Sequence, residues 1–319
     1  MNKRLLGKTG LSIAPLVFGG NVFGWTADET QSFALLDAFV DHGFNAIDTA
    51  DVYSAWVPGN SGGESETIIG NWLKQRPGMR DKVTIFTKVG SNRGSPERAG
   101  LSEKWILQAV EESLSRLRTD VIDLYFAHRP DPQTPYEETL SAFDKLLKNG
   151  KVRSIGASNM TADQLETSLR VAQENHLSSY QVLQPEYNLY DRASYDGPLR
   201  DLCIREGLGV VTYYSLASGF LSGKYRSKAD LEGSVRGTKI ASYLDERGMN
   251  ILKALDDVAS RHAAKPAEIA LAWLMAREGV TAPIASATRP EQVQSFAKAA
   301  SLTLTANDML DLEQASIAI

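Results

Sequence analysis

The sequence predicts an α/β protein, an (α/β)8 TIM barrel with an N-terminal β-hairpin at the barrel floor. Eight short β-rich runs alternate with longer segments of helical periodicity, which is typical of repeated β-then-α units around a parallel sheet. A length of 319 residues permits two average domains or one large barrel. Since no Pro/Gly-rich linker or charge block interrupts the alternation, we expect residues 1–319 to form one barrel domain rather than an open sheet with a second domain.

The predicted strands follow one another in a regular order. Residues 4–13 hold two short β-rich runs around a glycine-containing turn, which predicts the hairpin. The barrel strands are expected at residues 15–19, 45–49, 83–88, 121–127, 152–158, 181–184, 209–213 and 282–286. Each intervening segment has room for a helix that covers the sheet.

The helices are indicated by caps and by apolar spacing. Thr26 and Glu29 have the spacing of a capping box, with Gly43 as the stop, and Thr161 with Gln164 repeats the device. Within residues 101–117, apolar side chains recur every three or four positions and predict one buried stripe. These are Ile106, Ala109, Val110, Leu114 and Leu117.

One connection is unusually long. The 26 polar-rich residues 222–247, after the seventh barrel strand, exceed the length of ordinary connections, which favours a functional or disordered segment. We interpret this stretch as a lid over the barrel mouth, with an ordinary surface loop as the alternative.

The composition excludes several classes of function. The chain is 43% apolar and carries a formal charge of −5, which argues against a general nucleic-acid or anionic-membrane binder. No run approaches the roughly 20 apolar residues that a membrane helix needs. The single cysteine, Cys203, excludes an internal disulfide, and the N-terminal residues lack an apolar signal region, so we expect a cytoplasmic protein.

Four polar residues stand at or just beyond predicted strand ends, where barrel enzymes place their chemistry. Asp48 ends the second barrel strand, Lys88 ends the third, His128 follows the fourth, and Tyr53 lies in the loop after the second. Each has an ordinary structural explanation when taken singly, such as helix capping or packing. Together their chemistries are complementary, which favours a shared site.

The four side chains suit the delivery of a proton to a bound carbonyl group. A phenol titrates near pH ~10, and a neighbouring ammonium lowers that value by stabilising the phenolate. Lys88 can supply the ammonium, Asp48 its counter-ion, and His128 a hydrogen bond to the carbonyl oxygen. Because the set lacks a nucleophile or an electrophilic metal, another species must attack the carbonyl carbon.

In these residues the chain resembles the aldo-keto reductase family, close to its potassium-channel beta-subunit-like branch. Matching stretches extend from residues 6–20 to residues 283–293, nearly the whole chain. The resemblance implies that Tyr53 is the general acid/base, that His128 orients the carbonyl, and that Lys88 and Asp48 tune Tyr53. It also implies hydride from a nicotinamide, reduction of an aldehyde or ketone, and a small-molecule carbonyl substrate.

The resemblance further implies a nicotinamide site without a Rossmann motif, since no G-x-G-x-x-G occurs. Tyr213 would stack on the nicotinamide, although Tyr214 takes this place if the alignment shifts by one residue. Asp48 and Asn21 also belong to the expected cofactor site. The carboxamide, the pyrophosphate and the adenosine would then meet Ser158, Asn159, Gln184, Ser215, Leu216, Ser218, Gly219, Lys224, Ser286, Thr288, Arg289 and Gln292.

Arg289 and the lysines of residues 222–247 favour NADPH, because a 2′-phosphate binds basic side chains, while NADH stays open. Phe23, Trp25 and Trp56 are candidates for an apolar substrate wall.

We predict no metal, since the four histidines lack ligand spacing. Two alternatives are a weakly catalytic or non-catalytic nicotinamide-binding regulatory subunit and a Schiff-base lyase or aldolase using Lys88. The physiological substrate and the oligomeric state stay open.

Overall fold

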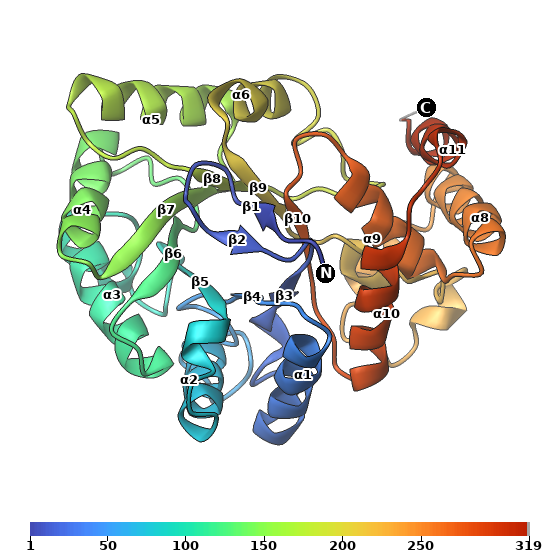
Figure 1. Cartoon of the computed structure of the whole chain (residues 1–319), viewed down its shortest axis with the longest axis horizontal. Coiled ribbons are helices and arrows are strands. Elements are labelled where there is room, and N and C mark those ends of the chain that lie inside the picture. Colours follow the sequence, from blue (N-terminus) through green and yellow to red (C-terminus); the bar gives the residue numbers. More distant parts are fainter. Residues whose placement is uncertain (318–319) are drawn as a thin grey trace.

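A computed structural model describes residues 1–317, in which eight parallel strands close into a barrel (Figure 1). Their order around the ring is β10-β3-β4-β5-β6-β7-β8-β9. This confirms the predicted fold, and every strand begins within two residues of its expected start. The strands are β3 Val17–Gly19, β4 Ala46–Asp48, β5 Thr84–Val89, β6 Ile122–Ala127, β7 Val152–Ser158, β8 Val182–Gln184, β9 Gly209–Thr212 and β10 Ala282–Ala285.

The N-terminal hairpin closes one end of the barrel, as predicted. Strands β1 Arg4–Leu5 and β2 Ser12–Ile13 pair antiparallel and lie across the barrel in Figure 1. Leu6 and Ile13 are fully buried in one apolar cluster with side chains of the barrel interior. An added Cβ on Gly7 would come within 2.2 Å of the Gly209 nitrogen, at the start of β9. The hairpin therefore plugs the amino-terminal end and leaves the carboxyl-terminal mouth for a site.

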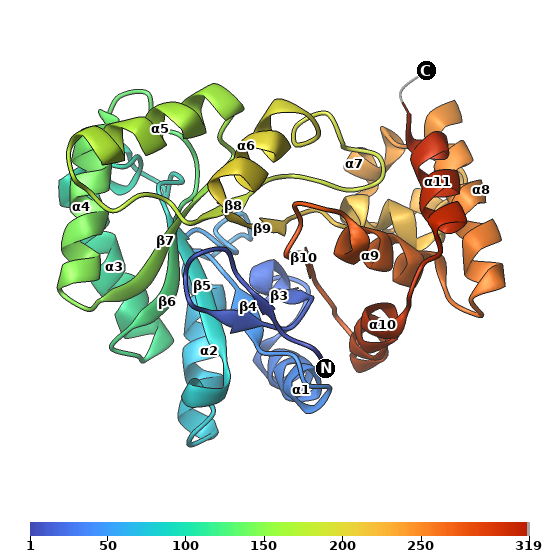
Figure 2. The same ribbon diagram turned by 45° about the horizontal axis from the view of Figure 1, so that its top comes forward.

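The helices surround the strands, as two views of the chain show (Figure 2). Near the C-terminus, α8 packs against both α9 and α11 and adds a second layer outside the ring. The helices are α1 Glu29–Asp41, α2 Glu64–Gln75, α3 Glu103–Leu117, α4 Tyr136–Lys148, α5 Ala162–Glu174, α6 Pro198–Glu206, α7 Gly237–Ala241, α8 Glu246–Arg261, α9 Pro266–Ala276, α10 Pro290–Ser301 and α11 Ala306–Ser316.

Of the two capping boxes predicted from the sequence, one is present in the structure and the other is not. Thr161 caps α5 in a box with Gln164, as predicted. The predicted capping box of Thr26 and Glu29 was wrong. Helix α1 begins after Asp28, whose side chain accepts a hydrogen bond from the Gln31 nitrogen at 2.8 Å. The Thr26 nitrogen instead donates to the Val22 oxygen at 3.0 Å, so this residue belongs to the turn that precedes the helix.

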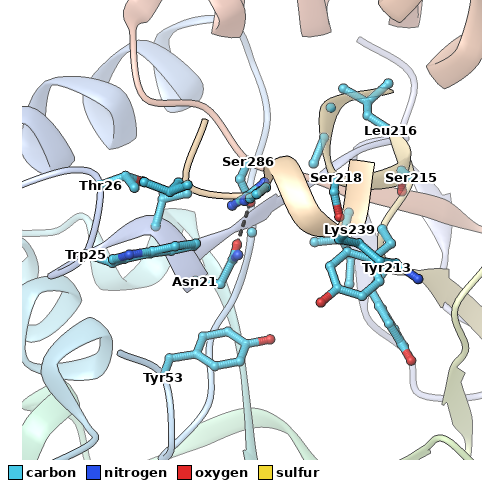
Figure 3. A pocket seen from close by; sticks show the side chains of 18 of the residues that line it. Asn21, Trp25, Thr26, Tyr53, Tyr213, Ser215, Leu216, Ser218, Lys239 and Ser286 are labelled. Atoms are coloured by element: carbon cyan, nitrogen blue, oxygen red, sulfur yellow. Dashed lines mark hydrogen bonds between the residues drawn. The ribbon is translucent and has the colours of Figure 1, made fainter. Parts of the chain in front are cut away.

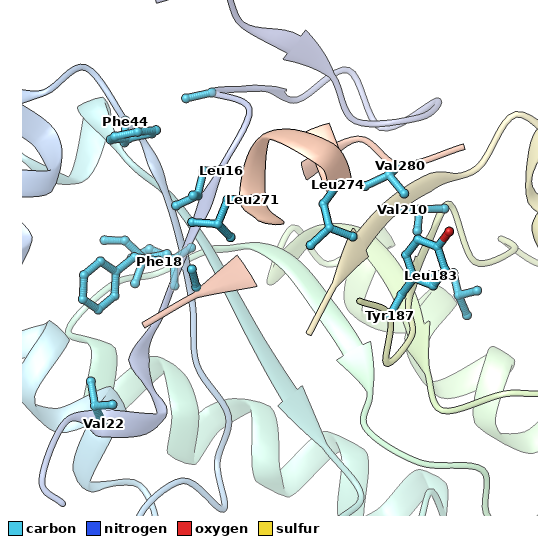
Figure 4. Packing of buried hydrophobic residues seen from close by; sticks show 14 of the residues in the cluster. Leu16, Phe18, Val22, Phe44, Leu183, Tyr187, Val210, Leu271, Leu274 and Val280 are labelled. Atoms are coloured by element: carbon cyan, nitrogen blue, oxygen red, sulfur yellow. The ribbon is translucent and has the colours of Figure 1, made fainter. Parts of the chain in front are cut away.

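Apolar side chains fill the space between the strands and the helices. Figure 4 shows Phe18 of β3, Leu183 of β8, and Leu271 and Leu274 of α9 in this layer. The predicted stripe of α3 is buried along its whole length. This packing holds the strand ends in fixed positions. No helix within residues 1–317 combines the length and the apolar character needed to cross a bilayer.

The long connection 222–247 is partly structured. It contains a short 3-10 helix at Lys228–Leu231 and helix α7, and it is anchored by the buried side chains of Ile240 and Tyr243. The Tyr243 ring stacks on Phe220 with 5.5 Å between ring centroids. These contacts hold the connection over the barrel mouth, where it forms one wall of the cleft described next.

Candidate active site

A cleft of about 1150 Å³ opens at the carboxyl-terminal end of the barrel. Figure 3 shows Trp25 and Tyr53 on one side and Tyr213, Ser215 and Ser218 on the other. Of the candidate site residues, all but Lys88 and Phe23 line this cleft. Those that do are Asn21, Trp25, Asp48, Tyr53, Trp56, His128, Ser158, Asn159, Gln184, Tyr213, Tyr214, Ser215, Leu216, Ser218, Gly219, Lys224, Ser286, Thr288, Arg289 and Gln292.

Lys88 lies directly behind the cleft, with its ammonium group fully buried. Its Nζ atom donates to Asp48 Oδ2 at 2.7 Å, to the Thr49 oxygen at 2.8 Å and to the Tyr53 hydroxyl at 3.0 Å. All three N–H donors are therefore used. Burial lowers the pKa of Lys88, although the Asp48 carboxylate opposes this effect. Neighbouring strands β4 and β5 place the pair side by side.

Tyr53 is positioned by the turn that follows β4. The Asp51 nitrogen donates to the Lys88 oxygen at 3.2 Å and the Tyr53 nitrogen to the Ala50 oxygen at 3.1 Å. Removal from water and the nearby Asp48 carboxylate raise the pKa of Tyr53 well above its ordinary value. Both effects act against the lowering of the pKa that the neighbouring ammonium was expected to cause. The phenol stays protonated, as a proton donor requires.

His128 faces Tyr53, with 6.1 Å between the two ring centroids. Its backbone nitrogen donates to the Val89 oxygen at 2.8 Å, which fixes the residue at the end of β6. Burial, Lys88 and Arg129 lower the pKa of His128 well below its ordinary value, so the imidazole is neutral. The buried Nδ1 atom has no hydrogen-bond partner among residues 1–317. A neutral imidazole can donate one hydrogen bond without carrying charge into the site.

The aromatic wall differs from the prediction at one position. Trp25 and Trp56 line the cleft and meet edge to face at 5.6 Å, and Trp56 also contacts the edge of Tyr53. Phe23 was wrongly placed in this wall. It is fully buried and stacks on Phe18 at 5.3 Å, because the 3-10 turn Gly20–Val22 after β3 directs the chain back to the core.

Polar side chains from four strands meet at one end of the cleft. Asn159 Nδ2 donates to the His128 oxygen at 2.9 Å, and the Tyr213 hydroxyl donates to Asn159 Oδ1 at 2.6 Å. Gln184 Nε2 donates to Asp48 Oδ1 at 2.9 Å. Ser158 donates from Oγ to the Gln184 oxygen at 2.7 Å. The candidate nicotinamide residues and the catalytic candidates therefore form one connected network.

Tyr213 and Tyr214 lie differently in the cleft. Tyr213 is held by its bond to Asn159, whereas Tyr214 is 47% exposed and adopts a left-handed backbone with φ 54°. A left-handed tyrosine is strained, and such strain concentrates at functional sites. The Tyr213 ring is therefore fixed beside Asn159, whereas the Tyr214 ring is open to the cleft.

The segment after β9 contains three of the residues expected to meet the cofactor, Leu216, Ser218 and Gly219. It forms the 3-10 segment Ala217–Ser222, interrupted by left-handed backbone at Ser218 and Gly219. Successive N–H groups in such a conformation form a concave donor surface that suits an anion. This turn therefore suits the phosphates of a dinucleotide.

The far end of the cleft belongs to β10 and α10. Ser286 donates from Oγ to Asn21 Oδ1 at 2.6 Å, a bond that bridges β10 to the turn after β3 (Figure 3). Gln292 accepts from the Thr288 nitrogen at 2.8 Å and from the Arg289 nitrogen at 3.1 Å through the same Oε1 atom. The Arg289 side chain lines this end of the cleft.

Sequence reasoning missed two cations of the cleft, Arg129 and Arg236, and included Lys239 only among the lysines of residues 222–247. Arg129 directly follows His128, so its position in the sequence was a usable signal. Arg236 and Lys239 lie in the connection 222–247, where only the proposed lid pointed to them. Arg236 lies over the Trp25 ring, 5.2 Å from its centroid.

The cleft is suited to an elongated polyanion. Its lining contains five cationic side chains, none of which forms an ion pair with a carboxylate among residues 1–317, whereas Asp48 is paired with Lys88. Unpaired cations and backbone donors along one cleft fit the phosphates of a dinucleotide. The five are Arg129, Lys224, Arg236, Lys239 and Arg289.

Comparison with known proteins decides the family. The model of the Aldo/keto reductase family matches residues 15–317. This chain belongs to the aldo/keto reductase family. It is 35% identical over 313 residues to a protein of Bacillus subtilis named uncharacterized oxidoreductase YrpG, covering 95% of the chain and 92% of that relative. Members of the family are generally NAD(P)H-dependent oxidoreductases.

Other relatives of this aldo/keto reductase carry a different name. A probable voltage-gated potassium channel subunit beta of Arabidopsis thaliana is 32% identical over 305 residues, covering 94% of the chain and 91% of the relative. A putative subunit of the same kind from Schizosaccharomyces pombe is 32% identical over 309 residues, covering 93% and 87%. Both relatives agree with the predicted resemblance to the potassium-channel beta-subunit-like branch of the family.

Titratable groups also lie outside the cleft. In the part of the chain that the structure describes, no three His, Cys, Asp or Glu side chains are grouped so that they could hold a metal ion.

Asp51, behind Lys88, is fully buried, and neither carboxylate oxygen has a partner among residues 1–317. Burial and the neighbouring Glu66 raise the pKa of Asp51 to about 8, although Arg93 and Arg116 oppose this effect.

This shift predicts the pH dependence of an Asp51→Asn variant. The folded reductase keeps the Asp51 proton up to about pH 8, whereas the unfolded chain loses it near 3.8, so wild-type stability falls between these values. The amide removes this penalty. We expect the variant to gain stability over wild type by on the order of 1 kcal/mol per pH unit in this window. Urea unfolding at pH 5 and pH 8 measures the gain.

Asp308→Asn is the matched control, because its effect has the opposite sign. Burial opposes ionisation of Asp308, but bonds from His262, Thr305 and Arg261 hold its pKa well below the ordinary value. Its amide variant should lose stability relative to wild type by the same amount at pH 5 and pH 8, because both values lie above the range in which this carboxyl group titrates. Equal differences for Asp51→Asn at both pH values would contradict the predicted shift.

Proposed function

We propose that this reductase converts an aldehyde or ketone to an alcohol, with NADPH as the hydride donor and Tyr53 as the proton donor. The observation that carries the proposal is the contact of Lys88 Nζ with both the Tyr53 hydroxyl, at 3.0 Å, and Asp48 Oδ2, at 2.7 Å. A protonated phenol beside a buried ammonium, at the base of a cleft lined with cations, suits proton delivery to a carbonyl oxygen.

Each of the four catalytic candidates has a separate role in the proposed reduction. NADPH, held by the polar and cationic side chains of the cleft, would supply the hydride for the carbonyl carbon. Tyr53 gives its hydroxyl proton to the carbonyl oxygen, and the Lys88 ammonium stabilises the phenolate that remains. Neutral His128 donates a hydrogen bond that orients the carbonyl oxygen. Asp48 keeps Lys88 charged in its buried position. Water then returns a proton to Tyr53.

A screen of carbonyl compounds, run in parallel with NADPH and NADH, tests this proposal. Loss of nicotinamide absorbance with simple aldehydes or ketones is the expected result. The alcohol should form in equal amount to the oxidised cofactor. Absence of turnover with every aldehyde and ketone, despite measured cofactor binding, would contradict the enzymatic proposal.

The preference for NADPH is proposed from Arg289. This guanidinium lines the β10 end of the cleft without an ion pair among residues 1–317 and suits a 2′-phosphate. Arg289→Ala should weaken NADPH binding by about 10–100-fold, the worth of a charge-assisted hydrogen bond, and leave NADH binding nearly unchanged. Fluorescence titration with both cofactors measures this difference. An equal loss for both cofactors would contradict the preference.

A second candidate function is a nicotinamide-binding regulatory subunit. The relatives named as potassium channel beta subunits favour it, because they share the whole barrel with this chain. The geometry of Asp48, Tyr53 and Lys88 argues for turnover instead. Tight cofactor binding combined with only single, slow turnovers would support the regulatory candidate.

The geometry does not favour a Schiff-base lyase. The Lys88 nitrogen is fully buried, does not line the cleft, and donates to three acceptors. A Schiff base needs an uncharged amine that is free to reach the carbonyl carbon. Borohydride treatment with a carbonyl compound should therefore leave Lys88 unlabelled.

A further inference from the structure

One cation of the cleft stands apart from the others. Arg129 follows β6, whereas Lys224, Arg236 and Lys239 come from the segment after β9 and Arg289 follows β10. In the ring order, β6 lies four strands from β10 in either direction, directly across the barrel mouth. Arg129 is therefore separated from the cations that suit the phosphates of a dinucleotide.

Arg129 instead lies beside the groups that act on the carbonyl. It directly follows His128 in the chain, and both residues line the cleft together with Tyr53 and Tyr213. The residue is exposed to the cleft and forms no ion pair or side-chain hydrogen bond among residues 1–317. Its five N–H donors are available to a ligand in the cleft.

Within residues 1–317, no carboxylate forms an ion pair with Arg129. Asp48 is the carboxylate that lines the cleft, and it already accepts bonds from Lys88 and Gln184. A planar guanidinium at the substrate end of a cleft binds a carboxylate or phosphate through two parallel hydrogen bonds. Trp56 and Tyr214, both about half exposed and lining the same cleft, offer apolar surface to the remainder of such a molecule.

We propose that Arg129 is a specificity-determining residue that selects carbonyl substrates with a second, anionic group, a carboxylate or a phosphate. The proposal rests on the proposed reductase function and names its substrate class. The aldehyde or ketone carbon faces Tyr53 and His128, and the anionic group lies toward Arg129. Neutral aldehydes of the same size enter the cleft but lack this contact.

A pair of isosteric aldehydes tests the selection. The nitro group of 4-nitrobenzaldehyde matches the planar shape of the carboxylate of 4-formylbenzoate but carries no net charge. Wild type is expected to have the higher kcat/KM for the acid. Arg129→Gln should lower the acid-to-nitro ratio of kcat/KM by about 10–100-fold, because a charge-assisted hydrogen bond is lost. Comparing ratios between variants cancels the different intrinsic reactivity of the two aldehydes.

Further variants separate this contact from a general charge effect. Arg129→Lys keeps the charge but loses the planar fork, so it should retain part of the ratio. Arg289→Ala, at the opposite end of the cleft, should change cofactor binding without changing the ratio. The same measurement with 4-formylphenyl phosphate distinguishes the two anions. An unchanged acid-to-nitro ratio of kcat/KM in Arg129→Gln, which includes an equal loss for both aldehydes, would overturn the proposal.

A binding measurement keeps the inference distinct from the enzymatic proposal. Trp25 and Trp56 line the cleft and report on occupancy through their fluorescence. Titration of the complex with NADP⁺ should show 4-formylbenzoate binding that weakens about 10–100-fold in Arg129→Gln. Arg129-dependent binding without turnover would support the ligand class and contradict the reductase activity. Turnover of neutral aldehydes without any preference for the acid would contradict the ligand class alone.

Discussion

Replacement of Tyr53 by phenylalanine is expected to lower kcat for carbonyl reduction by about 10²–10⁴-fold, the usual contribution of a positioned general acid. The substitution removes the hydroxyl that contacts Lys88 Nζ at 3.0 Å and keeps the ring that packs against Trp56. No other described hydroxyl group receives a bond from this ammonium. The loss should therefore fall on the chemical step. Single-turnover kinetics with saturating NADPH measures it directly.

The affinity for the cofactor distinguishes this role from a structural one. Tyr53→Phe should bind NADPH nearly as tightly as wild type, because the phosphates are expected to meet cations elsewhere in the cleft. Tyr225→Phe is the matched control: it removes a phenol from the same cleft, where the hydroxyl shares a hydrogen bond with Ser234 at 3.4 Å and lies beside Lys224. This control should keep normal turnover. Wild-type turnover by Tyr53→Phe would remove Tyr53 from the role of proton donor.

The sequence predicted the barrel and its catalytic end because both depend on local patterns. Each strand is a short apolar run, and a polar residue at its end must lie at the barrel mouth. For this reason the pattern of strand ends alone groups Asp48, Lys88 and His128 in one site. The bonds from Lys88 to Asp48 and Tyr53 follow from the neighbouring positions of β4 and β5.

The sequence could not predict features that depend on the path of the chain between elements. Phe23 looked like a cleft residue, but the turn before it directs the ring toward Phe18. Arg236 lies in a connection whose course depends on the docking of α7, so its contact with Trp25 has no local signal. The raised pKa of Tyr53 depends on burial, which residue spacing does not reveal.

Replacement of Lys88 by methionine is expected to affect both activity and stability. Loss of the ammonium leaves the phenolate of Tyr53 without its stabilising charge, so kcat should fall by about 10²–10⁴-fold. It also leaves the buried Asp48 carboxylate unpaired, which should cost about 3–5 kcal/mol of the free energy of unfolding. Steady-state kinetics and urea unfolding measure the two effects separately.

The double variant Asp48→Asn/Lys88→Met separates the two roles of this ion pair. Removing both charges relieves the unpaired carboxylate, so most of the lost stability should return, while activity should stay as low as in Lys88→Met. A purely structural lysine would give the opposite result, with activity recovering alongside stability. Because Asp48 also accepts a bond from Gln184 at 2.9 Å, the asparagine must turn its amide oxygen toward Gln184 to keep that contact. Recovery of stability without recovery of turnover would therefore identify Lys88 as a charge that acts on Tyr53 rather than a support for the barrel.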